Sequence, residues 1–188
     1  MKRAIFVLVI FIWAVSAAFA QSKSNGDISR KIKQLNIDKN ITVSYDGNTS
    51  RVMGVADNFT DKDVSRLGIQ AMNFAVGFFY AGDQLREAPD PIMLTFWVLT
   101  KRPRFADVQS VTFNIDGEAL IVDNIHYAAK ARENVEYINC KVSRNDLARI
   151  SGGRDVKVRI GNGEFKFLPD QIRMLSDLLI ISNAEAEY

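Results

Sequence analysis

The closing stretch of the chain, residues 155–181, constrains the fold most, because its pattern predicts two strands, a tight turn and a helix in succession. Asn162-Gly163 is a strong hairpin signal, since a type I′ turn needs positive φ angles at both central residues. A turn centred there would place Ile160 opposite Phe165. One face of the hairpin is then expected to meet a core and the other to meet solvent. The first face would carry Val156, Val158, Ile160, Phe165 and Phe167, and the second Lys157, Arg159, Glu164 and Lys166.

A helix is predicted directly after this hairpin. Pro169 suits the first helical position, where no backbone N–H is needed, and Asp170 places a negative charge in the first turn, where the helix dipole favours it. Apolar residues recur on one broad side of this segment, so we expect the helix to pack on a sheet. These residues are Ile172, Met174, Leu175, Leu178 and Leu179.

Further short segments alternate between apolar and polar residues and end at turn residues, which is typical of strands. Residues 70–80 are the clearest case, and Gly77 would weaken a helix there. Residues 92–100 are apolar on both faces, as in a central strand that is covered on both sides. Strands are also predicted at 41–45, 51–56, 109–115, 118–123 and 135–142.

A second hairpin is predicted around Asp116-Gly117, with Val111 opposite Val122. After it, residues 124–134 are expected to form a linker of mixed polarity.

Two short helices are indicated by capping-box spacing, one at Thr60 and Asp63 and the other at Ser143 and Asp146. Together with the strands they predict a mainly β fold, with one globular domain at residues 41–181. The expected architecture is a single antiparallel β-sandwich or open barrel of about nine short strands, with short helices and a packed C-terminal helix.

The N-terminus has the features of a secretory signal peptide. Met1-Lys2-Arg3 is a basic start, an apolar run follows, and Ala18-Phe19-Ala20 fits a signal-peptidase site. Cleavage is therefore predicted between Ala20 and Gln21, with export to the periplasm or the extracellular space. The alternative is an uncleaved membrane anchor, since residues 4–20 are close to the shortest spanning length. Residues 21–40 read as a polar leader or short helix, and residues 182–188 as a frayed tail.

The charge balance argues against a nucleic-acid partner. The chain has 24 Lys and Arg against 22 Asp and Glu, and loss of Lys2 and Arg3 with the signal peptide leaves 22 against 22. A neutral mature protein has no general electrostatic attraction to nucleic acid, so any basic surface must be local. Lys101-Arg102-Pro103-Arg104 is expected to form a basic turn after the strand at 92–100.

No catalytic or metal-binding motif is found. Cys140 is the single cysteine, so no disulfide can form within the chain, and its place in an alternating strand favours a buried side chain. His126 is the single histidine, which excludes a site with several histidine ligands. No cofactor is expected. A hydrolase could still use loop carboxylates, for which the candidates are Asp83, Glu87, Asp90, Asp107 and Asp123.

Two surface features are candidates for binding. The polar face of the closing hairpin carries Lys157, Arg159 and Lys166, which could attract a polyanion but also suit an ordinary solvated sheet face. Phe79 and Trp97 could stack a glycan or dock a partner if their faces of the sheet are open, and otherwise belong to the core.

The order of elements resembles that of uncharacterised secreted bacterial proteins of β-sandwich type. The matching features are the step Tyr80-Ala81-Gly82, an apolar strand after prolines, a strand-Asp-Gly-strand hairpin, a Ser-capped helix and the closing strand pair. They lie at 80–82, 91–98, 113–122, 143–150 and 156–168. The resemblance covers residues 56–180, implies an exported β protein and brings no catalytic residue with it.

These observations favour an exported non-catalytic protein, an envelope-associated binding or structural domain whose partner is another envelope protein or a polymer. A first alternative is an extracytoplasmic hydrolase that acts on a polymer through loop carboxylates. A second is a membrane-anchored domain that retains its N-terminal segment.

Overall fold

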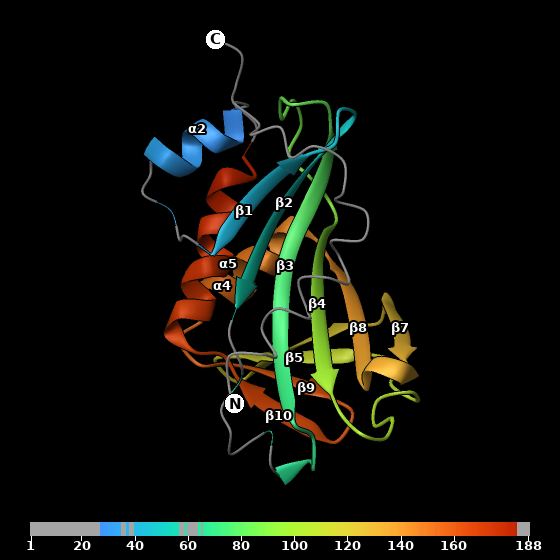
Figure 1. The fold of residues 1–188 in the computed structure, drawn as a ribbon. Coiled ribbons are helices and arrows are strands. Elements are labelled where there is room, and N and C mark those ends of the chain that lie inside the picture. The colour runs from blue at the N-terminus through green and yellow to red at the C-terminus, as the bar shows by residue number, and fades with distance from the viewer. Residues whose placement is uncertain are drawn as a thin grey trace.

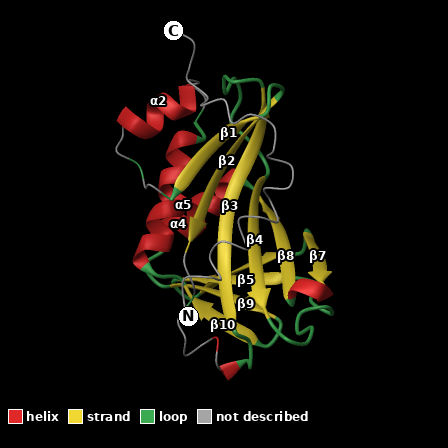
Figure 2. Ribbon diagram, viewed as in Figure 1, coloured by secondary structure: helices red, strands yellow, loops and turns green. Residues whose placement is uncertain are grey.

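The computed structural model describes residues 27–34, 37, 40–56, 59, 64 and 66–183. Within these residues the fold is mainly β, with two antiparallel sheets of six and four strands and three α-helices (Figures 1 and 2). The prediction of an antiparallel β domain with a packed C-terminal helix is confirmed. The predicted signal peptide, its cleavage point at Ala20 and Gln21, and the capping box at Thr60 and Asp63 lie outside the described residues.

The large sheet has the strand order β1-β2-β3-β4-β8-β7, with the long strands β3 and β4 at its centre (Figure 1). Every neighbouring pair in it is antiparallel. Its strands are β1 (Ile41–Tyr45), β2 (Thr49–Ala56), β3 (Ala71–Ala81), β4 (Ile92–Leu99), β7 (Ile125–Lys130) and β8 (Val135–Val142).

Gly77 allows the close pairing at the centre of this sheet. It lies on β3 between Met53 of β2 and Met93 of β4. A Cβ atom at this position would lie 2.5 Å from the backbone oxygen of Val52, a contact that only separation of the strands could relieve. Gly77, which argued against a helix in this segment, is therefore required by the strand.

The small sheet has the order β10-β9-β5-β6, and its strands cross behind those of the large sheet (Figure 1). The inner faces of the two sheets therefore enclose the core between them. Its strands are β5 (Val111–Ile115), β6 (Glu118–Val122), β9 (Val156–Ile160) and β10 (Gly163–Lys166).

The β5–β6 hairpin has the predicted register, with Val111 opposite Val122. Asp116 and Gly117 both have positive φ angles, 52° and 95°, as a type I′ turn requires. This turn prediction is confirmed.

The predicted register of the β9–β10 hairpin is wrong by two residues. Ile160 pairs with Gly163 and not with Phe165. The positive φ angle, 55°, belongs to Gly161, while Gly163 is buried where a Cβ atom would lie 2.5 Å from Leu67. Gly163 is thus used for close packing and Gly161 for the turn. A shift of two keeps each side chain on its predicted face.

The interpretation of residues 124–134 as a linker is also wrong. They contain β7, the edge strand of the large sheet, and the short 3-10 helix η1 (Ala131–Glu133). Strand β7 pairs with β8 along its whole length. The described fold therefore has ten strands, where about nine were expected.

Three α-helices complete the described fold: α2 (Asp27–Gln34), α4 (Arg144–Gly152) and α5 (Pro169–Ile181). Ser143 caps α4, because its Oγ accepts the backbone N–H of Asp146 at 3.0 Å, as the sequence predicted. Helix α5 begins at Pro169 and contacts α2, α4, β2 and β3 (Figure 1). Its buried side chains include Met174, Leu175, Leu178 and Ile181.

Phenylalanine rings fill the space between the two sheets. The ring centroids in this cluster lie between 5.2 and 6.5 Å apart, within the range of favourable aromatic contacts. The cluster joins strands of both sheets into one core. Its members are Phe59, Phe74, Phe96, Phe113, Phe165 and Phe167.

Candidate functional site

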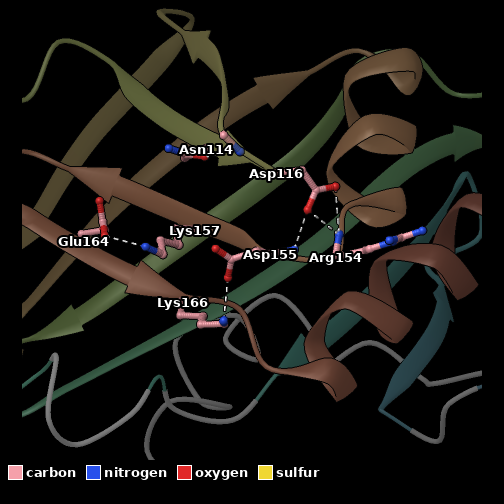
Figure 3. Close-up of polar contacts among 8 residues, drawn as sticks. Asn114, Asp116, Arg154, Asp155, Lys157, Glu164 and Lys166 are labelled. Carbon is pink, nitrogen blue, oxygen red and sulfur yellow. Dashed lines mark hydrogen bonds and ion pairs between the residues drawn. The ribbon is translucent and has the colours of Figure 1, made fainter.

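The polar face of the β9–β10 hairpin is largely neutralised by its own carboxylates (Figure 3). Lys157 lies 3.4 Å from Glu164, and Lys166 pairs with Asp155. The ion pair and hydrogen bond to Lys166 hold the pKa of Asp155 below its usual value. Two of the three basic residues predicted to attract a polyanion are therefore already paired.

Arg159, the third of these residues, is exposed and has no ion pair within the described part of the chain. Nearby, the carboxylate of Asp116 accepts the backbone N–H groups of Asp155 at 2.8 Å and Arg154 at 3.0 and 3.1 Å (Figure 3). These bonds lower the pKa of Asp116 and tie the β5–β6 turn to the start of β9. The charges on this face thus serve mainly to hold the small sheet together.

Phe79 borders a groove at one end of the large sheet. Its side chain is 49% exposed and lies 5.2 Å beneath the guanidinium of Arg51, in a cation–π contact. The groove has a volume of about 600 Å³, within the usual range for small-ligand sites. The β3–β4 connection supplies one wall with mixed chemistry: Gln84, Arg86, Glu87, Pro89, Asp90 and Pro91.

Trp97 lies on the same outer face of the sheet as Phe79 but not beside it. The register places Trp97 opposite Asn73, six residues from Phe79 along β3, which corresponds to roughly 20 Å. Its side chain is half-buried, and its indole N–H is buried without a hydrogen bond among the described residues. The two aromatic residues predicted as binding candidates therefore do not form one platform.

Cys140 and His126 lie on the neighbouring strands β8 and β7 but on opposite faces of the sheet. Cys140 is fully buried on β8, and burial raises the pKa of its thiol to about 12, so the reactive thiolate does not form near neutral pH. His126 is exposed on the edge strand β7. Among the candidate acids, Glu87 and Asp90 line the Phe79 groove and both are exposed. Within the described part of the chain, no cluster of potential metal ligands occurs.

A buried carboxylate that the sequence analysis missed holds the β4–β5 connection in place. Glu136 of β8 is 2% exposed and accepts the backbone N–H of Arg104 at 3.0 and 2.9 Å and that of Phe105 at 3.0 Å. The hydroxyl of Tyr127 donates to it at 2.8 Å. Burial and this bond raise the pKa of Tyr127 to about 12, which keeps it a hydrogen-bond donor. The signal was present, because Glu136 shares the alternation of Ile138 and the other inward residues of β8.

Comparisons with protein-family models, with curated proteins and with solved structures find no match. The resemblance to secreted bacterial proteins therefore stays a prediction. Among the described helices, none is long and apolar enough to cross a membrane.

Proposed function

We propose that the protein is an exported, non-catalytic binding protein that holds an extracytoplasmic glycan polymer in the Phe79 groove. The observation that carries this proposal is the groove itself, in which a half-exposed aromatic ring borders a wall of polar side chains. A sugar ring offers an apolar C–H face for stacking and hydroxyl groups for hydrogen bonds. Both kinds of contact are available here.

The wall of the groove suits this ligand. Gln84, Arg86 and Asp90 carry planar amide, guanidinium and carboxylate groups that pair with hydroxyls. Pro89 and Pro91 fix the local backbone, so less conformational entropy is lost when a ligand binds. Binding without catalysis is supported by the open setting of Glu87 and Asp90, because a hydrolytic site encloses its two carboxyl groups around the scissile bond and both of these are exposed.

A glycan hydrolase is the second candidate, favoured by the presence of both Glu87 and Asp90 in the groove. Such enzymes use two carboxyl groups on opposite sides of the scissile bond. Here both carboxylates come from the same loop, the β3–β4 connection, and both face solvent. A soluble glycan that is shortened by the wild-type protein, and not by Glu87→Gln, would favour this candidate over simple binding.

Export has a direct test in the intact mass of the protein recovered from cell fractions after expression with its native N-terminus. We expect a soluble extracytoplasmic species that begins at Gln21, because the apolar run is followed at once by a small-x-small cleavage site. A membrane-bound species that retains Met1 would contradict this expectation and would favour the anchored alternative.

The Phe79 groove is tested by calorimetric titration of the protein with soluble peptidoglycan fragments. Phe79→Ser is expected to weaken binding roughly two- to tenfold, because an aromatic contact contributes about 0.5–1.5 kcal/mol beyond its buried area. Ile180→Ser is the matched control, since Ile180 of α5 is also 49% exposed. Equal weakening by both changes, or no binding by the wild type, would overturn the assignment of this ligand to the groove.

A further inference from the structure

A second groove, with different chemistry, lies at the opposite end of β3 and β4 from Phe79. Ala71 pairs with Leu99 there, eight residues along β3 from Phe79, or roughly 25 Å. The groove has a volume of about 380 Å³, and the described residues that line it include three cationic side chains and no carboxylate. These residues are Gly68, Gln70, Thr100, Lys101, Arg102 and Arg104.

The three cations are available to a ligand. Lys101, Arg102 and Arg104 are all exposed, and none of them forms a side-chain ion pair within the described residues. This distinguishes them from Lys157 and Lys166, which are paired on the small sheet. Three unpaired cations held close together repel one another, so an anion bound among them is favoured over the empty groove.

The backbone that carries these cations is fixed from below. The buried Glu136 accepts the N–H groups of Arg104 and Phe105. Thr100 is almost fully buried, its hydroxyl donates to the carbonyl of Arg102 at 2.8 Å, and its own N–H donates to Asn134 at 2.8 Å. The loop is therefore preorganised, and a ligand need not order it on binding.

Arg104 is also positioned across the groove. Its Nη2 lies 3.4 Å from the place that a Cβ atom of Gly68 would occupy, and Gly68 has a φ of 65°, which favours glycine. The guanidinium thus lies against the backbone of the segment that precedes β3. A planar guanidinium in this place can donate two parallel hydrogen bonds to one oxyanion.

We propose that this basic groove binds a phosphate group, with Arg102 and Arg104 as hydrogen-bond donors and Lys101 as a point charge. The proposal is independent of the glycan groove, which it neither requires nor extends. Glu136 forms no ion pair with these cations, because its oxygens accept two backbone N–H groups and the Tyr127 hydroxyl on the inner side of the sheet. The groove volume admits a phosphate that carries an organic group.

The test compares two triple variants that remove the same net charge. Inorganic pyrophosphate is titrated into the protein at 0.15 M salt, and binding is followed by calorimetry. K101Q/R102Q/R104Q is expected to raise the Kd roughly tenfold or more, because charge-assisted hydrogen bonds are lost. K157Q/R159Q/K166Q, on the small sheet, is expected to change it less than about twofold, since salt screens distant charges.

Thermal melting of both variants shows whether they fold. Where the first triple variant is unfolded, the single change Arg104→Lys takes its place, because it keeps the charge but removes the two-pronged donor. It is expected to weaken binding by a smaller factor than Arg104→Gln. Equal loss in the two triple variants would show that only net charge matters and would overturn the site.

A second arm distinguishes the source of the phosphate. Vesicles of phosphatidylglycerol are sedimented with the protein, with phosphatidylcholine vesicles as the neutral control. Binding to pyrophosphate alone supports the site and assigns it to a soluble phosphate compound, whereas binding to the anionic vesicles that Arg104→Gln abolishes supports it and assigns it to a lipid headgroup. The absence of wild-type binding in both arms would overturn the proposal.

Discussion

Replacing Glu136 with alanine is expected to lower the free energy of unfolding by about 3–5 kcal/mol, because the buried N–H donors of two residues and the Tyr127 hydroxyl lose their acceptor together. Glu136 is 2% exposed, so bulk solvent does not reach these donors in the folded protein. The loss is measured by urea denaturation, as the change in midpoint at constant slope.

Two milder variants separate the contributions. Tyr127→Phe removes one donor to the carboxylate and is expected to lower the free energy of unfolding by about 1–3 kcal/mol, as for a hydrogen bond to a charged group. Glu136→Gln keeps one oxygen but turns an NH₂ toward the donors, and should fall between the other two. A loss below about 1 kcal/mol for Glu136→Ala would contradict the view that this carboxylate holds the loop.

The same variant connects stability to the basic groove. Glu136→Ala leaves Lys101, Arg102 and Arg104 in place but removes the bonds that fix the backbone of Arg104. If the groove depends on preorganisation, pyrophosphate binding should weaken although no cation has been removed and one negative charge has gone. Charge alone would predict the opposite sign.

Local sequence patterns predicted most of the strands, because the alternation of side chains and the residues in the turns determine where these strands begin and end. Asp116-Gly117 fixes the β5–β6 register through two positive φ angles, with little competition from the rest of the fold. In the β9–β10 hairpin the turn is displaced from the predicted Asn162-Gly163 position. Gly163 is instead needed for close packing, because a Cβ atom there would meet Leu67 of a distant segment. Local turn preferences cannot predict this long-range contact.

Strand β7 escaped detection for a related reason. It lies at the edge of the sheet, and its apolar alternation is too short to mark a strand, because only Ile125 and Tyr127 pack against the core. Its pairing with β8 rests largely on backbone hydrogen bonds, which leave no pattern in the sequence, and the bond from Tyr127 to Glu136 depends on the fold.

The candidate sites were predicted only as lists of residue types. Phe79, Trp97 and the basic turn at 101–104 were visible in the sequence, but which cations are paired depends on strand register. Lys157 meets Glu164 because β9 and β10 pair as they do, whereas the side chains of Arg102 and Arg104 form no ion pair with a described carboxylate. The fold therefore pairs most of the cations on the closing hairpin and leaves those of the 101–104 turn unpaired among the described residues.

Phe74→Ala is expected to lower the free energy of unfolding by about 3–5 kcal/mol, since it leaves a cavity between the two sheets. Phe74 is fully buried, and its ring centroid lies 6.0 Å from that of Phe59, 6.1 Å from Phe96 and 5.2 Å from Phe167. Its loss removes contacts with both sheets at once, so the cavity cannot close by a small local shift.

Phe79→Ala is the matched control for this change, because Phe79 lies on the same strand five residues away and therefore on the opposite face. It is half-exposed, and its loss should lower the free energy of unfolding by less than about 1 kcal/mol, mainly through the contact with Arg51. Denaturation of the two variants side by side measures the difference. Equal losses would mean that the two faces of β3 are not distinguished as described, and both the core assignment and the open Phe79 groove would have to be abandoned.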